Sequence, residues 1–87
     1  MANTVIALQI KTITAGQSFA IPAGASGIVI ENNGSTDDVT ITSPNATYTD
    51  TWTLKSGQSF SPTSNPVPFD SITVNAGTST AQIAFVN

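Results

Sequence analysis

The chain has 87 residues, of which 39% are hydrophobic and 8% charged, with two lysines, five acidic residues and a net charge of −3. So few basic residues exclude the phosphate neutralisation by which proteins hold nucleic acid, and they also exclude attraction to an anionic membrane surface. The absence of Cys and His excludes disulfides, thiolate metal sites and Ser–His or Cys–His nucleophile systems.

The residue types are those of a β protein. The chain holds fourteen Thr, nine Ile and six Val but only two Leu, and β-branched residues favour strands. No stretch has the composition that favours helices, and no apolar run approaches the ~18 residues of a membrane-spanning helix. Met1 is not followed by the basic and apolar regions of a signal peptide. We therefore expect one all-β domain over residues 1–87, synthesised in the cytoplasm without an export signal.

Alternating apolar and polar residues, interrupted by clusters of Gly, Pro and Asn, predict short strands at a spacing of about ten residues. We expect seven or eight strands, which in chain order lie at residues 4–10, 17–21, 26–31, around 39–41, 47–54, around Phe60, 69–75 and 80–86. This pattern is typical of a small antiparallel β-sandwich, either immunoglobulin-like or jelly-roll-like.

Apolar positions within these strands indicate which faces are buried. The first strand places Ile6, Leu8 and Ile10 on one face, which is the period of a half-buried strand. The strand over 26–31 has apolar residues on both faces, and Val29 on the second face predicts cover on both sides of the sheet. Near the end of the chain, the residues expected to face the core are Ile72, Val74, Ile83 and Phe85.

The polar loop Asn32–Asp38 is rich in residues that form Asx turns or tolerate positive φ. With Val39 and Ile41 beyond it, this loop predicts a hairpin. Its four Asn and Asp residues could offer oxygen ligands to a calcium ion, but their spacing matches no calcium-loop motif. We therefore favour a hydrated turn and expect no metal or other cofactor.

The strand over 47–54 alternates strictly, with Tyr48 and Trp52 on one face and four Thr on the other. Two aromatic side chains on one strand face could form a sugar-stacking platform, which makes a carbohydrate-binding or adhesin module the alternative function. Because the chain has one Trp and one Tyr, packing of these rings in the core is the favoured interpretation.

Gly-Gln-Ser-Phe occurs twice, at residues 16–19 and 57–60, and each copy follows an apolar residue three positions earlier. The spacing from Ile28 to Val39 is 11 residues, and the spacing from Ile72 to Ile83 is the same. We infer a diverged duplication of a three-strand unit, with halves over approximately 10–43 and 51–87. The halves either form one sandwich or swap between subunits.

Catalysis is not expected from this chain. Its five carboxylates could in principle form the acid pair of a glycoside hydrolase. However, Asp37 and Asp38 lie in a predicted turn, and Asp50 and Asp70 lie on or beside strands of a domain too small for a substrate cleft. We therefore expect a protein that is not an enzyme.

The turns Thr14–Phe19 and Leu54–Phe60, together with the closing strands Ser71–Val74 and Thr80–Ile83, carry a resemblance to a group of viral proteins. The chain resembles the short, Thr/Ser/Asn-rich, Cys-free β proteins of tailed-bacteriophage virions: capsid decoration proteins, head-fibre bases and tail-fibre modules. The resemblance implies a structural protein on the virion surface, on either the head or the tail. It further implies binding to the major capsid protein or other virion proteins, and a homo-oligomer, for which a trimer is favoured.

Two segments are suited to assembly contacts in such a role, the N-terminal residues 1–4 and the Pro-rich loop 61–68. Both are uncharged, and neither is needed for the core. Many copies on a repeated lattice would need only weak individual contacts, because linked sites raise the effective concentration. The predicted contact residues are Met1, Ala2, Asn3, Thr4, Pro62, Asn65, Pro66, Val67 and Pro68.

Overall fold

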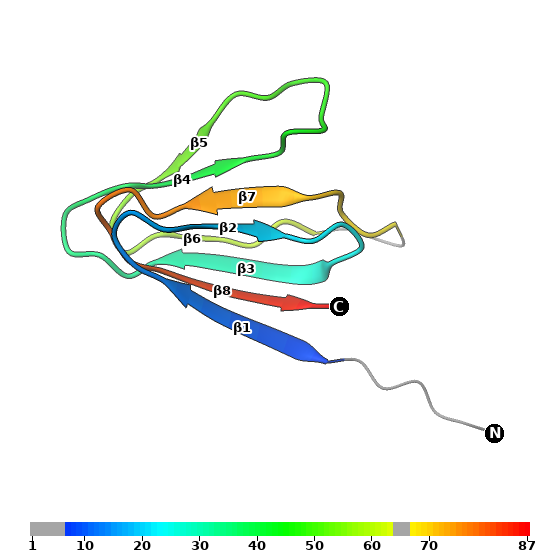
Figure 1. The fold of residues 1–87 in the computed structure, drawn as a ribbon, viewed down its shortest axis with the longest axis horizontal. Coiled ribbons are helices and arrows are strands. Elements are labelled where there is room, and N and C mark those ends of the chain that lie inside the picture. The colour runs from blue at the N-terminus through cyan, green and yellow to red at the C-terminus, as the bar shows by residue number, and fades with distance from the viewer. Residues whose placement is uncertain (1–6, 64–66) are drawn as a thin grey trace.

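The computed structural model describes residues 7–63 and 67–87 of the chain. These residues form a sandwich of two four-stranded antiparallel sheets (Figure 1). The first sheet has the order β1-β8-β3-β6, with the strands β1 (Leu8–Ile13), β8 (Ala81–Val86), β3 (Ser26–Asn32) and β6 (Ser59–Phe60). The second sheet has the order β2-β7-β4-β5, with the strands β2 (Ser18–Ile21), β7 (Ile72–Asn75), β4 (Val39–Thr42) and β5 (Trp52–Leu54). The expected all-β sandwich is confirmed.

The strand pairing is that of one long hairpin that has been rolled up. β1 pairs with β8, β2 with β7, β3 with β6 and β4 with β5, and the pairs β3–β8 and β4–β7 complete the two sheets. Consecutive strands lie in different sheets in every case except β4 and β5. This is the topology of a double-sheet jelly roll, one of the two sandwich forms that the strand pattern predicted.

The prediction that the loop after β3 closes a hairpin is wrong. β3 lies in the first sheet and β4 in the second, so residues 33–38 cross from one sheet to the other. The chain leaving β3 is held by other neighbours: the Asn32 amide donates to the Gln58 carbonyl at 2.9 Å, and the Asn33 amide donates to the Thr80 carbonyl at 2.9 Å. Asn- and Gly-rich segments form corners between sheets as readily as hairpin turns, so the local signal could not separate the two.

The core lies between the two sheets and is built from alternate residues of their strands. The first sheet contributes Ile28, Ile30, Ile83 and Phe85, and the second contributes Ile21, Val39, Ile41, Leu54, Ile72 and Val74. Each of these side chains is at most 6% exposed, which confirms the predicted burial of Ile72, Val74, Ile83 and Phe85. Full burial of one such side chain stabilises the fold by about 1.5–3 kcal/mol.

The outward face of the first sheet departs from the sequence prediction. Leu8 and Ile10, which were expected on a half-buried face, are 62% and 70% exposed. β1 is an edge strand that pairs with β8, and of its residues only Ile13 is buried. Val29 on β3 was expected to be covered, and it is 40% exposed. Ile6 lies outside the described residues.

The two Gly-Gln-Ser-Phe turns are alike in detail. The Gln17 Oε1 accepts a hydrogen bond from the Thr14 amide at 2.9 Å, and the Gln58 Oε1 accepts one from the Lys55 amide at 2.9 Å. Gly16 and Gly57 have φ angles of 82° and 80°, in the left-handed region that glycine adopts without strain. The same local sequence therefore forms the same turn at both positions.

The pairing pattern of β1–β4 also recurs in β5–β8. Shifting each strand number by four converts the order of the first sheet into that of the second. Val39 lies opposite Leu54 and Ala81 opposite Ile13, which makes Val39 and Ala81 counterparts. The equal spacing noted in the sequence pairs Val39 with Ile83 instead, so it is not the structural correspondence. The correspondence spans four strands rather than three, and the duplication itself stays a prediction.

Candidate functional site

A groove opens along the edge of the sandwich where β5 of the second sheet approaches β6 of the first. It has a volume of about 240 Å³ and lies under the loop of residues 43–51, which arches from β4 to β5 (Figure 1). Buried Ile41 and Ile72 reach its floor. The side chains that give the groove its chemistry are Tyr48, Asp50, Trp52, Phe60, Phe69 and Asp70.

Trp52 forms one wall of this groove. It lies opposite buried Ile41 in the β4–β5 register, on the side of the sheet that faces the core, yet it is 58% exposed. Its ring packs on Phe60 of the first sheet, with ring centroids 5.9 Å apart and an angle of 48° between the planes. The favoured prediction of a buried Trp52 is wrong, because β5 is an edge strand and the facing β6 has only two residues to cover it.

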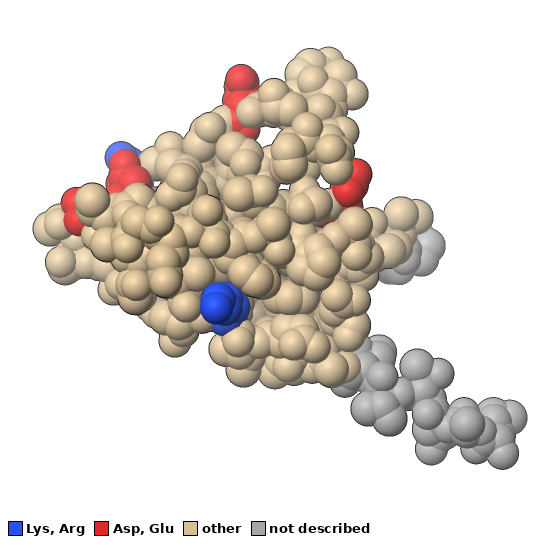
Figure 2. Space-filling model, viewed as in Figure 1, with Lys and Arg blue, Asp and Glu red and all other residues tan. Residues whose placement is uncertain are grey.

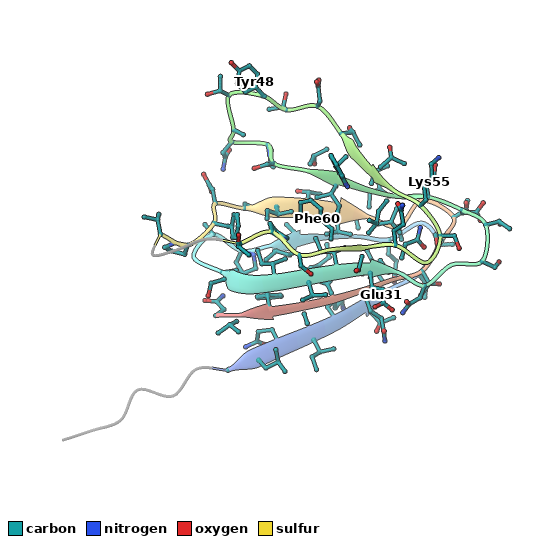
Figure 3. The ribbon with its side chains drawn as sticks, turned by 180° about the vertical axis from the view of Figure 1, so that it is seen from behind. Glu31, Tyr48, Lys55 and Phe60 are labelled. Carbon is teal, nitrogen blue, oxygen red and sulfur yellow. The ribbon has the colours of Figure 1, made fainter. Side chains whose placement is uncertain are left out.

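Tyr48 lies on the arch above the groove and is 89% exposed (Figure 3). The sequence predicted that Tyr48 and Trp52 share one strand face, but β5 begins only at Trp52. The preceding residues form a loop that starts with a turn, in which the Ala46 amide donates to the Ser43 carbonyl at 3.1 Å. Pro44 at the second position of this turn favours it, since its φ is fixed near the required value. The alternation of residues 47–51 is therefore not that of a strand.

The polar groups at the groove are acidic or neutral. Asp50 and Asp70 line it, and the Asp70 Oδ1 accepts hydrogen bonds from the Ser71 amide at 2.7 Å and from the Asn45 Nδ2 at 3.3 Å. Neither of the two lysines of the chain lines the groove. Lys55 lies at the opposite end of β5 from Tyr48 (Figure 3), where its Nζ pairs with the Asp38 carboxylate at 3.2 Å. The groove thus favours neutral or cationic ligands over anions.

A second exposed feature is an apolar patch on the outward side of the first sheet. We call it the outer apolar face, and it consists of Leu8, Ile10, Val29, Ala84 and Val86. The strand register brings these residues side by side: Leu8 lies opposite Val86, and Ala84 lies opposite both Ile10 and Val29. A shallow hollow of about 180 Å³ lies over part of the patch. Leu8, Ile10 and Val29 are 40–70% exposed, and Ala84 and Val86 are half-buried.

The residues predicted as assembly contacts are only partly within the described chain. Pro62 is half-buried and lines the groove, whereas Val67 is 70% exposed and Pro68 is also exposed. Met1, Ala2, Asn3, Thr4, Asn65 and Pro66 lie outside the described residues. Their role in assembly stays a prediction.

In the loop that could offer calcium ligands, the first residue, Asn32, forms hydrogen bonds with other protein groups instead. The buried Asn32 Nδ2 donates to the Asp37 and Leu54 carbonyls, both at 2.8 Å, and its Oδ1 accepts from the Gly34 amide at 2.9 Å and the Ser79 hydroxyl at 2.7 Å. These bonds occupy the amide oxygen and direct it toward the protein. Among residues 7–63 and 67–87, no group of three carboxylates is placed to hold a metal ion.

Comparison with protein-family models, curated proteins and solved structures found no match to the chain. The described residues contain no helix long and apolar enough to cross a membrane. The functional argument therefore depends on the two surface features. Sequence reasoning named Tyr48 and Trp52 but missed the outer apolar face, whose signal was the apolar residues on both faces of the strand containing Val29.

Proposed function

We propose that this chain is a non-enzymatic structural protein that attaches to a repeated protein lattice, as a decoration or head-fibre protein does on the surface of a tailed-phage virion. The observation that carries this proposal is the outer apolar face. Five apolar side chains on three adjacent strands form this contiguous surface, although a small soluble domain usually scatters its exposed apolar residues singly.

The position of the outer apolar face suits attachment to a protein surface. It lies on the outward side of β1, β8 and β3, which are three adjacent strands of the first sheet. Together they present a broad surface with only a shallow hollow. Leu8 and Ile10 are not required by the core, because β1 contributes Ile13 to the buried cluster instead. Their apolar character therefore serves a contact outside the chain, with a partner whose own surface is apolar.

The low charge of the chain defines how this contact would behave. On the face shown in Figure 2 the charged residues either gather at one end or lie singly, and the chain has only seven in total. Attachment through apolar contact with so few charges would be nearly insensitive to salt, since screening weakens only charge–charge attraction. Weak contacts suffice when many copies, or a homotrimer, bind a repeated lattice, because each engaged site raises the effective concentration at the next.

The test is whether the protein attaches to virus particles purified from the culture in which its gene is found. Immunogold labelling of density-gradient-purified virions is expected to place the chain at regular positions on the particle. Particles stripped of the protein are expected to rebind it equally well in low and in high salt. Recovery of the chain only in the soluble fraction would overturn the proposal.

A pair of variants tests the outer apolar face itself. Ile10→Lys puts a charge in the middle of the patch, and Thr12→Lys adds the same charge two residues along the same face of β1, opposite Gln82. Ile10→Lys is expected to abolish rebinding, while Thr12→Lys, which lies opposite Gln82 at the edge of the patch, retains it. Equal behaviour of the two variants would contradict the role of the patch. Deletion of residues 1–4 tests the predicted N-terminal contact in the same assay.

A further inference from the structure

We propose that the groove between β5 and β6 binds one pyranose ring of a neutral glycan. The site is separate from the proposed attachment surface, since β6 and β1 are the opposite edges of the first sheet. A particle-bound copy could thus use the outer apolar face for attachment and present the groove to a ligand.

The aromatic side chains provide the stacking surface. Trp52 is 58% exposed, and its ring is held in place by contact with Phe60, with the centroids 5.9 Å apart. Tyr48, which is 89% exposed, lines the same groove from the arch above. Aromatic rings that are apolar on their faces and polar at one end suit a ligand that is itself apolar on one side and hydroxylated around its edge, as a pyranose is.

The carboxylates provide hydrogen-bond acceptors for the sugar hydroxyls. Asp70 is oriented by two hydrogen bonds from Ser71 and Asn45, both of which go to Oδ1. Among the described residues nothing donates to its Oδ2, which can accept from a ligand hydroxyl. Asp50 lines the same groove and offers further acceptors. Hydrogen bonds from hydroxyls to carboxylates are charge-assisted and therefore stronger than those between neutral groups.

Charge and size define the class of sugar. Two carboxylates line the groove and neither lysine does, so an acidic sugar would meet like charges without a compensating cation. A volume of about 240 Å³ lies below the roughly 300–1,000 Å³ of sites for drug-sized ligands, so the groove suits a single ring within a longer glycan. A mostly apolar concave surface with a few polar groups is the usual form of a small-molecule site.

The single tryptophan of the chain makes the test direct, because all indole fluorescence comes from the proposed site. The full chain is titrated with maltohexaose, cellohexaose, mannohexaose and chitohexaose, and with hexagalacturonate as the acidic counterpart. At least one neutral oligosaccharide is expected to shift the Trp52 emission in a saturable manner. Hexagalacturonate is expected to bind at least about tenfold more weakly, because of like-charge repulsion.

Two variants connect the signal to the groove. Tyr48→Ala removes an exposed ring while retaining Trp52 as the reporter, and it is expected to weaken binding with no change in thermal stability. Asp70→Asn is expected to weaken the neutral glycan and to reduce discrimination against hexagalacturonate. Asp37→Asn removes the same charge from the loop after β3, outside the groove, and is expected to change neither.

Other outcomes would overturn the proposal. If none of the oligosaccharides changes the Trp52 emission, the groove does not bind a glycan. A response only to an apolar peptide such as acetyl-Leu-Phe-amide would assign the groove to a protein partner. A glycan response that Tyr48→Ala and Asp70→Asn leave unchanged would place the binding elsewhere on the chain.

Discussion

The corner after β3 and the corner after β7 are counterparts in the two halves of the sandwich, and they differ in the side chain that is buried at their first residue. Glu31 pairs with Ser59 and Asn75 pairs with Ser18, so the next residues, Asn32 and Ala76, occupy equivalent positions. The Asn32 amide donates to the Gln58 carbonyl at 2.9 Å, and the Ala76 amide donates to the Gln17 carbonyl at 3.0 Å. Both residues are 0% exposed. The backbone is thus the same, but one corner buries a polar side chain and the other a methyl group.

The length of the following connection accounts for this difference. Six residues, 33–38, lie between Asn32 and β4, whereas four residues, 77–80, lie between Ala76 and β8. In the longer corner, the Asn32 side chain binds the Asp37 carbonyl within the loop and the Leu54 carbonyl of β5. The shorter corner needs no such anchor. Equivalent backbone corners can therefore be stabilised by a buried hydrogen-bonded network in one case, and in the other by a buried methyl group and an exposed bond from the Gly77 amide to the Asn75 Oδ1.

Asn32→Ala gives the first corner the residue of the second, and it tests how much the buried network contributes to stability. The variant leaves two carbonyls, one amide and the Ser79 hydroxyl without their partner in a largely buried place. We expect the free energy of unfolding to fall by about 3–5 kcal/mol, measured by urea denaturation. Asn33→Ala is the control, because its exposed side chain makes one hydrogen bond, to Gln82 at 2.8 Å, and should cost under about 1 kcal/mol. Equal losses would show that the buried network contributes little.

The reciprocal change, Ala76→Asn, tests whether the second corner could accept the same network. Ala76 is 0% exposed, so the added amide would be buried without the carbonyl that the longer loop supplies at Asp37. We expect a loss of about 2 kcal/mol in the free energy of unfolding, from overpacking and unsatisfied polar atoms. A stabilised variant would show instead that the shorter corner can form its own set of partners.

Gly34→Ala tests how tightly the first corner is packed. A Cβ at this position would clash with the Ser79 Oγ and lie 3.2 Å from the Asn32 Oδ1, so it must displace the hydroxyl that donates to Asn32. We expect a cost of about 1–2 kcal/mol by denaturation. In a double-mutant cycle, Gly34→Ala should cost less in a Ser79→Ala background, because the displaced oxygen is already gone. Additive costs would mean that Ser79 moves aside freely.

The Gly-Gln-Ser-Phe turn, which occurs in both halves, is expected to contribute little to the free energy of unfolding. Gln17→Ala and Gln58→Ala each remove one side-chain acceptor from an exposed turn. We expect each to lower the free energy of unfolding by about 0.5–1 kcal/mol and the two losses to agree within error. A large difference between them would show that the two turns, although alike in geometry, differ in their contribution to stability.

Much of the fold could be predicted from the sequence. Alternation of apolar residues and the positions of Gly, Pro and Asn predicted a sandwich of seven or eight strands, and they predicted the core residues of β7 and β8. The hairpin predicted after β3 was wrong, because the turn residues of the segment specify a change of direction and not the strand that the chain joins next. The burial of Leu8 and Ile10 was also predicted wrongly, because alternation identifies two faces without showing which one meets the other sheet.

The candidate groove was only partly foreseen. The sequence brought Tyr48 and Trp52 together as a possible platform, but assigned them to the core. Phe60, Asp70 and the arch were not connected with them, because these elements are separated in the chain and meet only where the edges of the two sheets approach. The exposure of Trp52 depends on how far β6 extends, which no local pattern records.

The class of structure, the approximate number of strands and the recurrence of one turn at two places could all be predicted from the sequence alone. These properties follow from local chemistry: the two-residue period of a strand, the β-branched side chains and the left-handed glycines of Gly-Gln-Ser-Phe. The jelly-roll order, the outward direction of the apolar residues on β1 and the groove at the β5–β6 edge could be seen only in the folded structure. Those properties depend on pairing between distant strands, and the free energy of that pairing is shared across the whole sandwich rather than held in any one segment.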